Sequence, residues 1–168
     1  MQLRQIDKAI YRDHLRKVTA AMVVVLLAGA VGISTLLIAL FGTEGESHLV
    51  LNAIGVGIGA GLSGALVYYF RQHSYMDEVW YVWLLKQELN RIYRQSVKLK
   101  VAVKQEKEEA LIISYFNLKG SKQLYELDDN TLTMDEINQK IVDLDQTIQR
   151  LGLSITVDDY RPALLNQL

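Results

Sequence analysis

The sequence predicts an all-α protein in which a transmembrane helical hairpin is followed by a cytoplasmic helical bundle or coiled coil of about three helices. Two observations predict the hairpin: residues 18–41 and 49–70 carry no charged side chain, and only seven residues join them. A third observation predicts the bundle, because apolar residues recur at alternating spacings of three and four between residues 82 and 151. A mean hydropathy of +0.10 with 22% charged residues fits this separation of apolar and polar stretches.

The two charge-free stretches are long enough to cross a bilayer. They contain 24 and 22 residues. As helices they would extend about 36 and 33 Å, against a hydrocarbon core of about 30 Å. Core helices of a soluble protein are seldom this long without a charge. A cleaved signal peptide is disfavoured by the 17-residue leader of mixed charge and by the second stretch that follows at once.

Lysine and arginine flank each apolar stretch only at the end away from the connection between them. The leader, residues 1–17, is basic, and further lysines and arginines follow residue 70, whereas the connection, residues 42–48, carries two acids and no base. The positive-inside rule therefore predicts that both termini are cytoplasmic and that the connection lies outside. The residues concerned are Arg4, Lys8, Arg12, Arg16 and Lys17 in the leader, Glu44 and Glu46 in the connection, and Arg71, Lys86, Arg91 and Arg94 after the second stretch.

Small side chains recur on one face of each apolar stretch, where they would let two helix backbones approach closely. We expect these two faces to meet within the hairpin. They comprise Ala28, Gly32 and Thr35 in the first stretch and Gly57, Gly61 and Gly64 in the second. Gly55 and Gly59 point roughly the other way and are candidates for contact with a second copy of the chain. The general abundance of glycine in membrane helices explains them equally well.

Three helices are expected within the cytoplasmic region, residues 71–152. Their apolar positions run from Val82 to Val103, from Leu111 to Leu127 and from Met134 to Leu151. Thr133 and Glu136 have the spacing of a capping box at the start of the third helix, and Gly152 is suited to end it. Gly120 marks either a bend or a close contact in the second helix. Residues 153–168 are expected to form a loosely held tail.

The first cytoplasmic helix is strongly basic. Residues 91–107 contain six basic side chains and one acid, whereas the later helices are acidic. Two interpretations remain open: the bases contact anionic lipid headgroups or an acidic partner, or they form a solvated flank offset by the protein's own acids. The candidate headgroup contacts are Arg91, Arg94, Lys98, Lys100, Lys104 and Lys107, together with Trp80 and Trp83.

The sequence offers no constellation for catalysis, and we expect neither a cofactor nor a bound metal. The glycine pattern of residues 59–64 matches a dinucleotide fingerprint, but it lies inside an apolar stretch without the strand that the fingerprint requires. His14, His48 and His73 fall on both sides of the expected membrane, so they cannot share a metal. No Asp, Glu, Lys, Arg or His lies within either stretch, which argues against a proton-coupled pump. A net charge of -1 argues against a nucleic-acid partner.

Three segments resemble those of a known bacterial family. They are Ile6–Arg12, Val79–Arg94 and Gly120–Glu136. On these segments the chain resembles domain-of-unknown-function family 3087, small two-span inner-membrane proteins of gram-negative bacteria. The resemblance implies multi-pass residence in the bacterial inner membrane, with the connection in the periplasm. It implies no activity and no site residues.

From these observations we expect a membrane-anchored, non-enzymatic interaction or assembly module. Its partners would be the lipid bilayer and either another copy of the chain or another membrane or cytoplasmic protein. The alternative is an oligomeric membrane pore or effector built from the glycine-rich hairpin, since glycines and small hydroxyls can line a passive pore.

Overall fold

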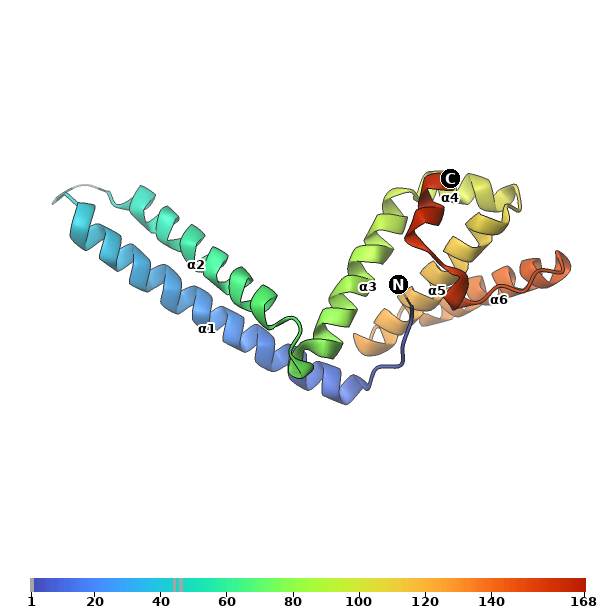
Figure 1. Ribbon diagram of the computed structural model, residues 1–168, viewed down its shortest axis with the longest axis horizontal. Helices are drawn as coiled ribbons and strands as arrows, with labels where there is room; N and C mark the ends of the chain where they lie inside the picture. The colour runs from blue at the N-terminus through green and yellow to red at the C-terminus, as the bar shows by residue number, and fades with distance from the viewer. Residues whose placement is uncertain (1, 44, 46) are drawn as a thin grey trace. The chain divides into compact units, whose positions relative to one another are not determined.

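A computed structural model describes residues 2–43, 45 and 47–168. This part of the chain is helical and contains no β-strand, which confirms the all-α prediction. The helices are α1 (Lys8–Phe41), α2 (Leu49–Phe70), η1 (Ser74–Met76), α3 (Asp77–Arg94), α4 (Ser96–Lys104), α5 (Glu108–Leu127), α6 (Met134–Arg150), η2 (Val157–Asp159) and η3 (Pro162–Gln167) (Figure 1).

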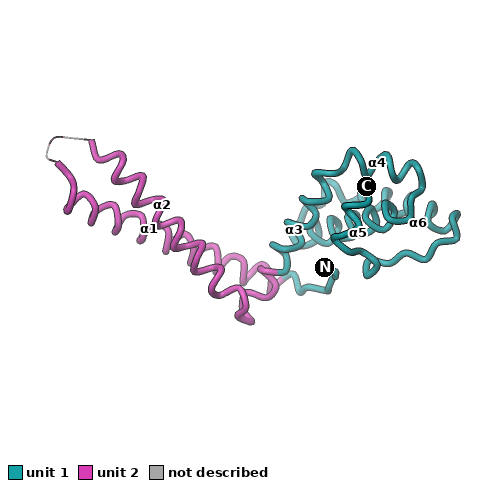
Figure 2. The backbone as a smooth tube through the Cα atoms, turned by 45° about the horizontal axis from the view of Figure 1, so that its top comes forward, with its two compact units in different colours: residues 1–8, 81–168 teal, residues 9–80 magenta. Residues whose placement is uncertain are grey.

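The chain divides into two compact units (Figure 2). We call residues 9–80 the hairpin unit and residues 1–8 with 81–168 the helical unit. The helical unit is therefore discontinuous in sequence, because its first segment precedes α1 and the remainder follows α2.

The hairpin unit consists of α1 and α2 lying side by side, followed by the turn that leads to α3 (Figures 1 and 2). The observed ends at Phe41, Leu49 and Phe70 agree with the predicted stretches, and the leader is helical from Lys8 onward. Both helices are long and apolar enough to cross a membrane. In the most apolar 18-residue window, 0% of α1 and 17% of α2 is buried, whereas a core helix would be mostly buried. Glu44 and Glu46, used above for orientation, lie outside the described residues.

Gly55 and Gly59 form the contact between the two long helices. A Cβ atom on Gly55 would lie 2.8 Å from the backbone nitrogen of Ser34. One on Gly59 would lie 2.7 Å from the nitrogen of Ala30. Only glycine permits this approach, because a methyl group would overlap the opposing backbone. A hydroxyl reaches across next to the glycines, from Ser34 Oγ to the carbonyl oxygen of Asn52 at 3.4 Å.

The predicted packing faces of the hairpin are therefore wrong. A Cβ added to Gly32, Gly57, Gly61 or Gly64 would meet nothing within 4 Å, and Ala28 and Thr35 are exposed. Gly55 and Gly59, assigned above to a second copy, are buried inside the hairpin instead. Both faces of α2 carry small residues, so spacing alone could not distinguish them. The serines do distinguish them, since Ser63 also donates to a carbonyl of α1, that of Met22, at 3.4 Å.

Helix α5 is at the centre of the helical unit and contacts α4, α6, η2 and η3. Its buried side chains lie on more than one face, as a central helix requires. Leu111, for example, packs with Leu144 and Ile148 of α6. Gly120 lies at a close contact, where an added Cβ would be 3.2 Å from Cδ2 of Leu89.

The first predicted cytoplasmic helix is two helices. It breaks at Gln95, whose amide bonds to the carbonyl of Ile92 at 2.9 Å, and α4 then continues from Ser96. Leu89 and Ile92 before the break and Leu99 after it are nevertheless all buried, as the heptad pattern predicted. The break contains neither proline nor glycine, so packing rather than local propensity places it.

The two ends of α6 differ in how well the sequence predicted them. The predicted capping box at Thr133 is wrong, because its φ of -104° and ψ of 3° are not extended and its hydroxyl makes no capping hydrogen bond. That hydroxyl is buried without a partner among the described residues. At the other end Gly152 has φ 67°, and the amide of Leu153 bonds to the carbonyl of Ile148 at 3.1 Å. This Schellman arrangement confirms Gly152 as the stop.

Residues 153–168 are not a loose tail, which corrects a further prediction. Tyr160 is 0% exposed and stacks on Phe116 with ring centroids 4.1 Å apart. Its hydroxyl donates to Glu88 Oε1 at 2.5 Å, and burial raises the pKa of this phenol far above its ordinary value. The segment is held because its aromatic and aliphatic side chains complete the core around α5.

The glycine contact gives a first prediction. Gly55→Leu and Gly59→Leu should each destabilise the hairpin by about 1–3 kcal/mol, the usual cost of overpacking. Gly57→Leu and Gly61→Leu are matched controls that gain the same helix propensity without a clash, so they should be neutral or stabilising. Thermal unfolding of the full chain in detergent measures the difference. Equal destabilisation in all four variants would contradict the assigned contact.

The core of the helical unit gives a second prediction. Ile141→Lys should cost several kcal/mol, because Ile141 is 6% exposed and a buried unpaired charge is expensive. Gln146→Lys on the exposed side of α6 should change stability by less than about 0.5 kcal/mol. Chemical denaturation of the full chain, followed by far-ultraviolet circular dichroism, compares the two. Similar midpoints would show that this seam is not buried in solution.

Candidate functional site

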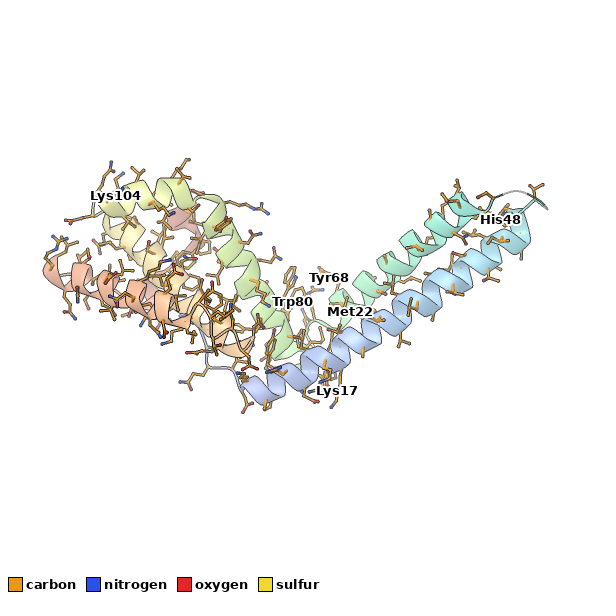
Figure 3. All side chains as sticks on the ribbon, turned by 180° about the vertical axis from the view of Figure 1, so that it is seen from behind. Lys17, Met22, His48, Tyr68, Trp80 and Lys104 are labelled. Atoms are coloured by element: carbon orange, nitrogen blue, oxygen red, sulfur yellow. The ribbon has the colours of Figure 1, made fainter. Side chains whose placement is uncertain are left out.

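An exposed basic surface lies on the helical unit. It consists of six side chains from the end of α3, from α4 and from the connection to α5: Arg91, Arg94, Lys98, Lys100, Lys104 and Lys107. All six are exposed, and Figure 3 shows Lys104 projecting from the end of α4. The helix break at Gln95 separates Arg91 and Arg94 on α3 from Lys98, Lys100 and Lys104 on α4.

Several acidic side chains of the helical unit pair with bases outside the basic surface. Among the described residues, none of the six bases has a carboxylate oxygen within the 4.0 Å of an ion pair. Asp128 pairs instead with Lys86 at 3.1 Å, and Glu136 pairs with Lys140 at 2.5 Å. Glu106, the one acid within the basic stretch, pairs with Arg150. The second interpretation above, that the protein's own acids offset this stretch, therefore has no direct ion pair behind it.

Exposed apolar side chains lie among these bases. Tyr93 is 74% exposed, Val97 77% and Val101 53%, at intervals of four residues. Trp83 is also exposed, whereas Trp80 belongs to the hairpin unit and is half-buried. Cationic groups interleaved with apolar ones can bind a partner that presents acidic and apolar side chains together. The basic surface has this chemistry.

The segment before α1 is bound to the helical unit by a three-residue network. The backbone N–H of Arg4 donates to the Tyr81 hydroxyl at 3.1 Å. That hydroxyl donates to Gln123 Oε1 at 3.0 Å, and Gln123 Nε2 donates to the carbonyl of Arg4 at 2.6 Å. The Arg4 guanidinium also lies 4.6 Å from the centre of the Tyr81 ring, a cation–π contact.

Two further features strengthen this attachment. Lys8 forms an ion pair with Asp129, which follows the C-cap residue of α5, Asp128. Burial raises the pKa of the Tyr81 phenol, although the hydrogen bond from Arg4 works in the opposite direction. A neutral phenol can both accept from Arg4 and donate to Gln123, so the network needs the protonated form.

Sequence reasoning missed this network entirely. Arg4 and Tyr81 are 77 residues apart, and Arg4 and Gln123 are 119 apart. Glutamine and tyrosine at isolated positions carry no pattern that would indicate such a contact.

The three histidines lie in three different segments of the described part of the chain. Within residues 2–43, 45 and 47–168, no group of three or more histidine or acidic side chains could hold a metal ion. Two of the histidines make local contacts: Nδ1 of His14 lies 3.0 Å from Glu78 Oε2, and the His14 ring packs against the Tyr75 ring at a tilt of 33°. His73 accepts a hydrogen bond from the amide of Tyr75 at 3.2 Å.

These features define an all-helical protein with two long apolar helices and a separate helical unit that carries a basic surface. The chain belongs to the family described as protein of unknown function DUF3087, whose sequence model matches residues 1–165. The match includes the segment after Gly152, which the structure shows to be part of the core. Comparison with curated proteins and with solved structures found no significant match.

Proposed function

We propose that this chain is a two-span protein of the bacterial inner membrane whose helical unit recruits a partner protein in the cytoplasm through the basic surface. The role is that of a non-enzymatic interaction or assembly module. The observation that carries the proposal is a set of six exposed bases without ion pairs among the described residues, interleaved with Tyr93, Val97 and Val101.

The closure of the helical unit supports the two-span topology. Residues 2–8 precede α1, yet they bind Tyr81, Gln123 and Asp129, which follow α2. If α1 and α2 both cross the bilayer, the segments before and after them lie on the same side, as this contact requires. A single crossing would separate Arg4 from Gln123. The excess of lysine and arginine at this side favours the cytoplasm.

The nature of the basic surface supports a protein partner. Val97 and Val101 lie one turn apart on α4 and Tyr93 lies on α3, and exposed apolar side chains flanked by bases suit a partner segment that presents acidic and apolar side chains. Charge attraction would accelerate association, and the apolar contacts would supply affinity. Contact with anionic headgroups is the competing occupant of the same surface.

The pore alternative loses the residues on which it depended. Gly55 and Gly59 were its candidate contacts between copies, but they face Ser34 and Ala30 within one hairpin. A second copy cannot reach them without displacing α1. Gly57, Gly61 and Gly64 remain exposed and form a surface of small residues. Such a surface does not by itself indicate a pore.

Topology is the third prediction. The chain has no cysteine, so a single introduced thiol can be labelled without background. Thr43→Cys, between the two apolar helices, should react with a membrane-impermeant maleimide on intact cells. Asn130→Cys in the helical unit should react only after the membrane is permeabilised. Labelling of Asn130→Cys from outside would overturn the proposed orientation.

Partner recruitment is the fourth prediction. A photo-crosslinking amino acid at Tyr93 should capture a protein in native membranes, because this side chain is 74% exposed beside the bases. The same probe at Gln146 on α6 is the control. Lys98→Glu with Lys104→Glu should reduce the yield by about tenfold or more, since it reverses two charges.

Lys140→Glu provides the matched charge control, because Lys140 pairs with Glu136 away from the basic surface. Mass spectrometry of the adducts identifies the captured chain and its acidic segment. Adducts with lipid alone at Tyr93 would replace the protein partner by a headgroup contact. Equal loss in Lys140→Glu would show that net charge, not this surface, matters.

A further inference from the structure

A cavity of about 450 Å³ lies within the hairpin unit. Its walls come from residues 17–25 of α1 and residues 63–70 of α2, and His73, Tyr75 and Met76 close one end. Lys17 and Met22, two of its lining residues, are labelled on α1 in Figure 3. The volume falls in the range of sites that hold small organic ligands.

The change of side-chain size along α2 explains why the cavity opens there. The contact row on α2 begins with Gly55, Gly59 and Ser63, which let the backbones touch. The following turns of the same row present Leu66, Val67 and Phe70. The space between these side chains and α1 is not filled by the protein. The cavity is thus a direct result of the sequence.

The chemistry of the walls selects an apolar occupant. Val18, Ala21, Met22 and Val25 of α1 face the leucine, valine and phenylalanine of α2. The Ser63 hydroxyl is hydrogen-bonded to the carbonyl of Met22, so it does not call for a water molecule. Cavities lined by apolar side chains remain dry and bind hydrocarbon.

Polar groups gather at one end only. Lys17 and His73 lie among the lining residues there. Lys17 forms an exposed ion pair with Asp13 at 2.7 Å and also interacts with the Tyr75 hydroxyl, which leaves one of the three ammonium donors. An exposed pair of this kind is weak, so an additional anion can join it. Nδ1 of His73 accepts from the amide of Tyr75, which leaves the proton on Nε2 as a donor.

Together with the proposed insertion of the hairpin in a membrane, the apolar walls and the polar end favour an amphiphilic ligand. We propose that the cavity binds one acyl chain of an anionic phospholipid, with the phosphate held at Lys17 and His73. The apolar walls receive the chain, and the cationic end lies where the apolar part of α1 meets its basic first turns. This inference rests on the proposed insertion of α1 and α2 in the bilayer and not on the partner protein.

The test is native mass spectrometry of the purified full chain in detergent with phosphatidylglycerol or phosphatidylethanolamine of the same chain length. The wild-type protein should retain one phosphatidylglycerol in preference to phosphatidylethanolamine. Ala21→Trp, which fills the cavity, should weaken binding of both lipids by about tenfold. Ala20→Trp is the matched control, because Ala20 is exposed and is not a lining residue.

Recognition of the headgroup is tested separately, by variants that do not fill the cavity. Lys17→Gln should lower the preference for phosphatidylglycerol by about fivefold, whereas Arg16→Gln, with the same loss of charge one residue earlier, should not. Circular dichroism confirms that each variant keeps its helices. Equal binding by Ala21→Trp and Ala20→Trp would overturn the cavity as the site. Equal effects of Lys17→Gln and Arg16→Gln, or equal binding of both lipids by the wild type, would overturn recognition of the anion.

Failure of this inference and failure of the proposed function can be told apart. Photo-crosslinking at Tyr93 reports on the partner, and thiol labelling at Thr43 and Asn130 reports on the topology. Lipid selectivity lost in Lys17→Gln with crosslinking intact supports the cavity independently of the basic surface. Reversed labelling would remove the membrane placement on which both depend.

Discussion

Attachment of the first residues to the helical unit is the constraint on which the remaining arrangement depends. Arg4 is bonded through its own backbone groups to Tyr81 and Gln123, so the contact does not require a particular side chain at position 4. It joins the chain before α1 to the chain after α2, and it thereby closes the hairpin at its open end. Any account of the protein must keep these two segments in the same compartment. An interaction module that works on one side of a membrane satisfies this condition directly.

The two units solve different physical problems. In the hairpin unit, large apolar side chains face outward while glycine and serine lie inside, which is the reverse of a soluble core. In the helical unit, aliphatic and aromatic side chains surround α5, as the hydrophobic effect requires in water. The cavity between α1 and α2 lies beyond the glycine row, where larger side chains follow on α2. The proposed lipid site is thus a consequence of the packing and needs no additional structural element.

The basic surface and the core of the helical unit use different faces of the same helices. The buried residues of α3 and α4 are Leu89, Ile92 and Leu99, whereas the exposed ones include Arg94, Lys98 and Val97. Mutations on the exposed face can therefore test the proposed recruitment without unfolding the unit. The family match over residues 1–165 covers both faces and the final core segment, which fits a unit that folds as a whole.

The sequence alone determined the helical class, the end of α1, both limits of α2, the seam of α6 and the stop at Gly152, because each depends on local periodicity or on one residue's backbone freedom. It also named the six bases, since their exposure follows from charge. Only the tertiary structure decided which glycine face of α2 meets α1, because two faces carry the same small residues and serine hydroxyls choose between them. The break at Gln95, the burial of Tyr160 and the attachment of Arg4 likewise had no local signal. They result from contacts between residues far apart in the chain, which a pattern of neighbours cannot encode.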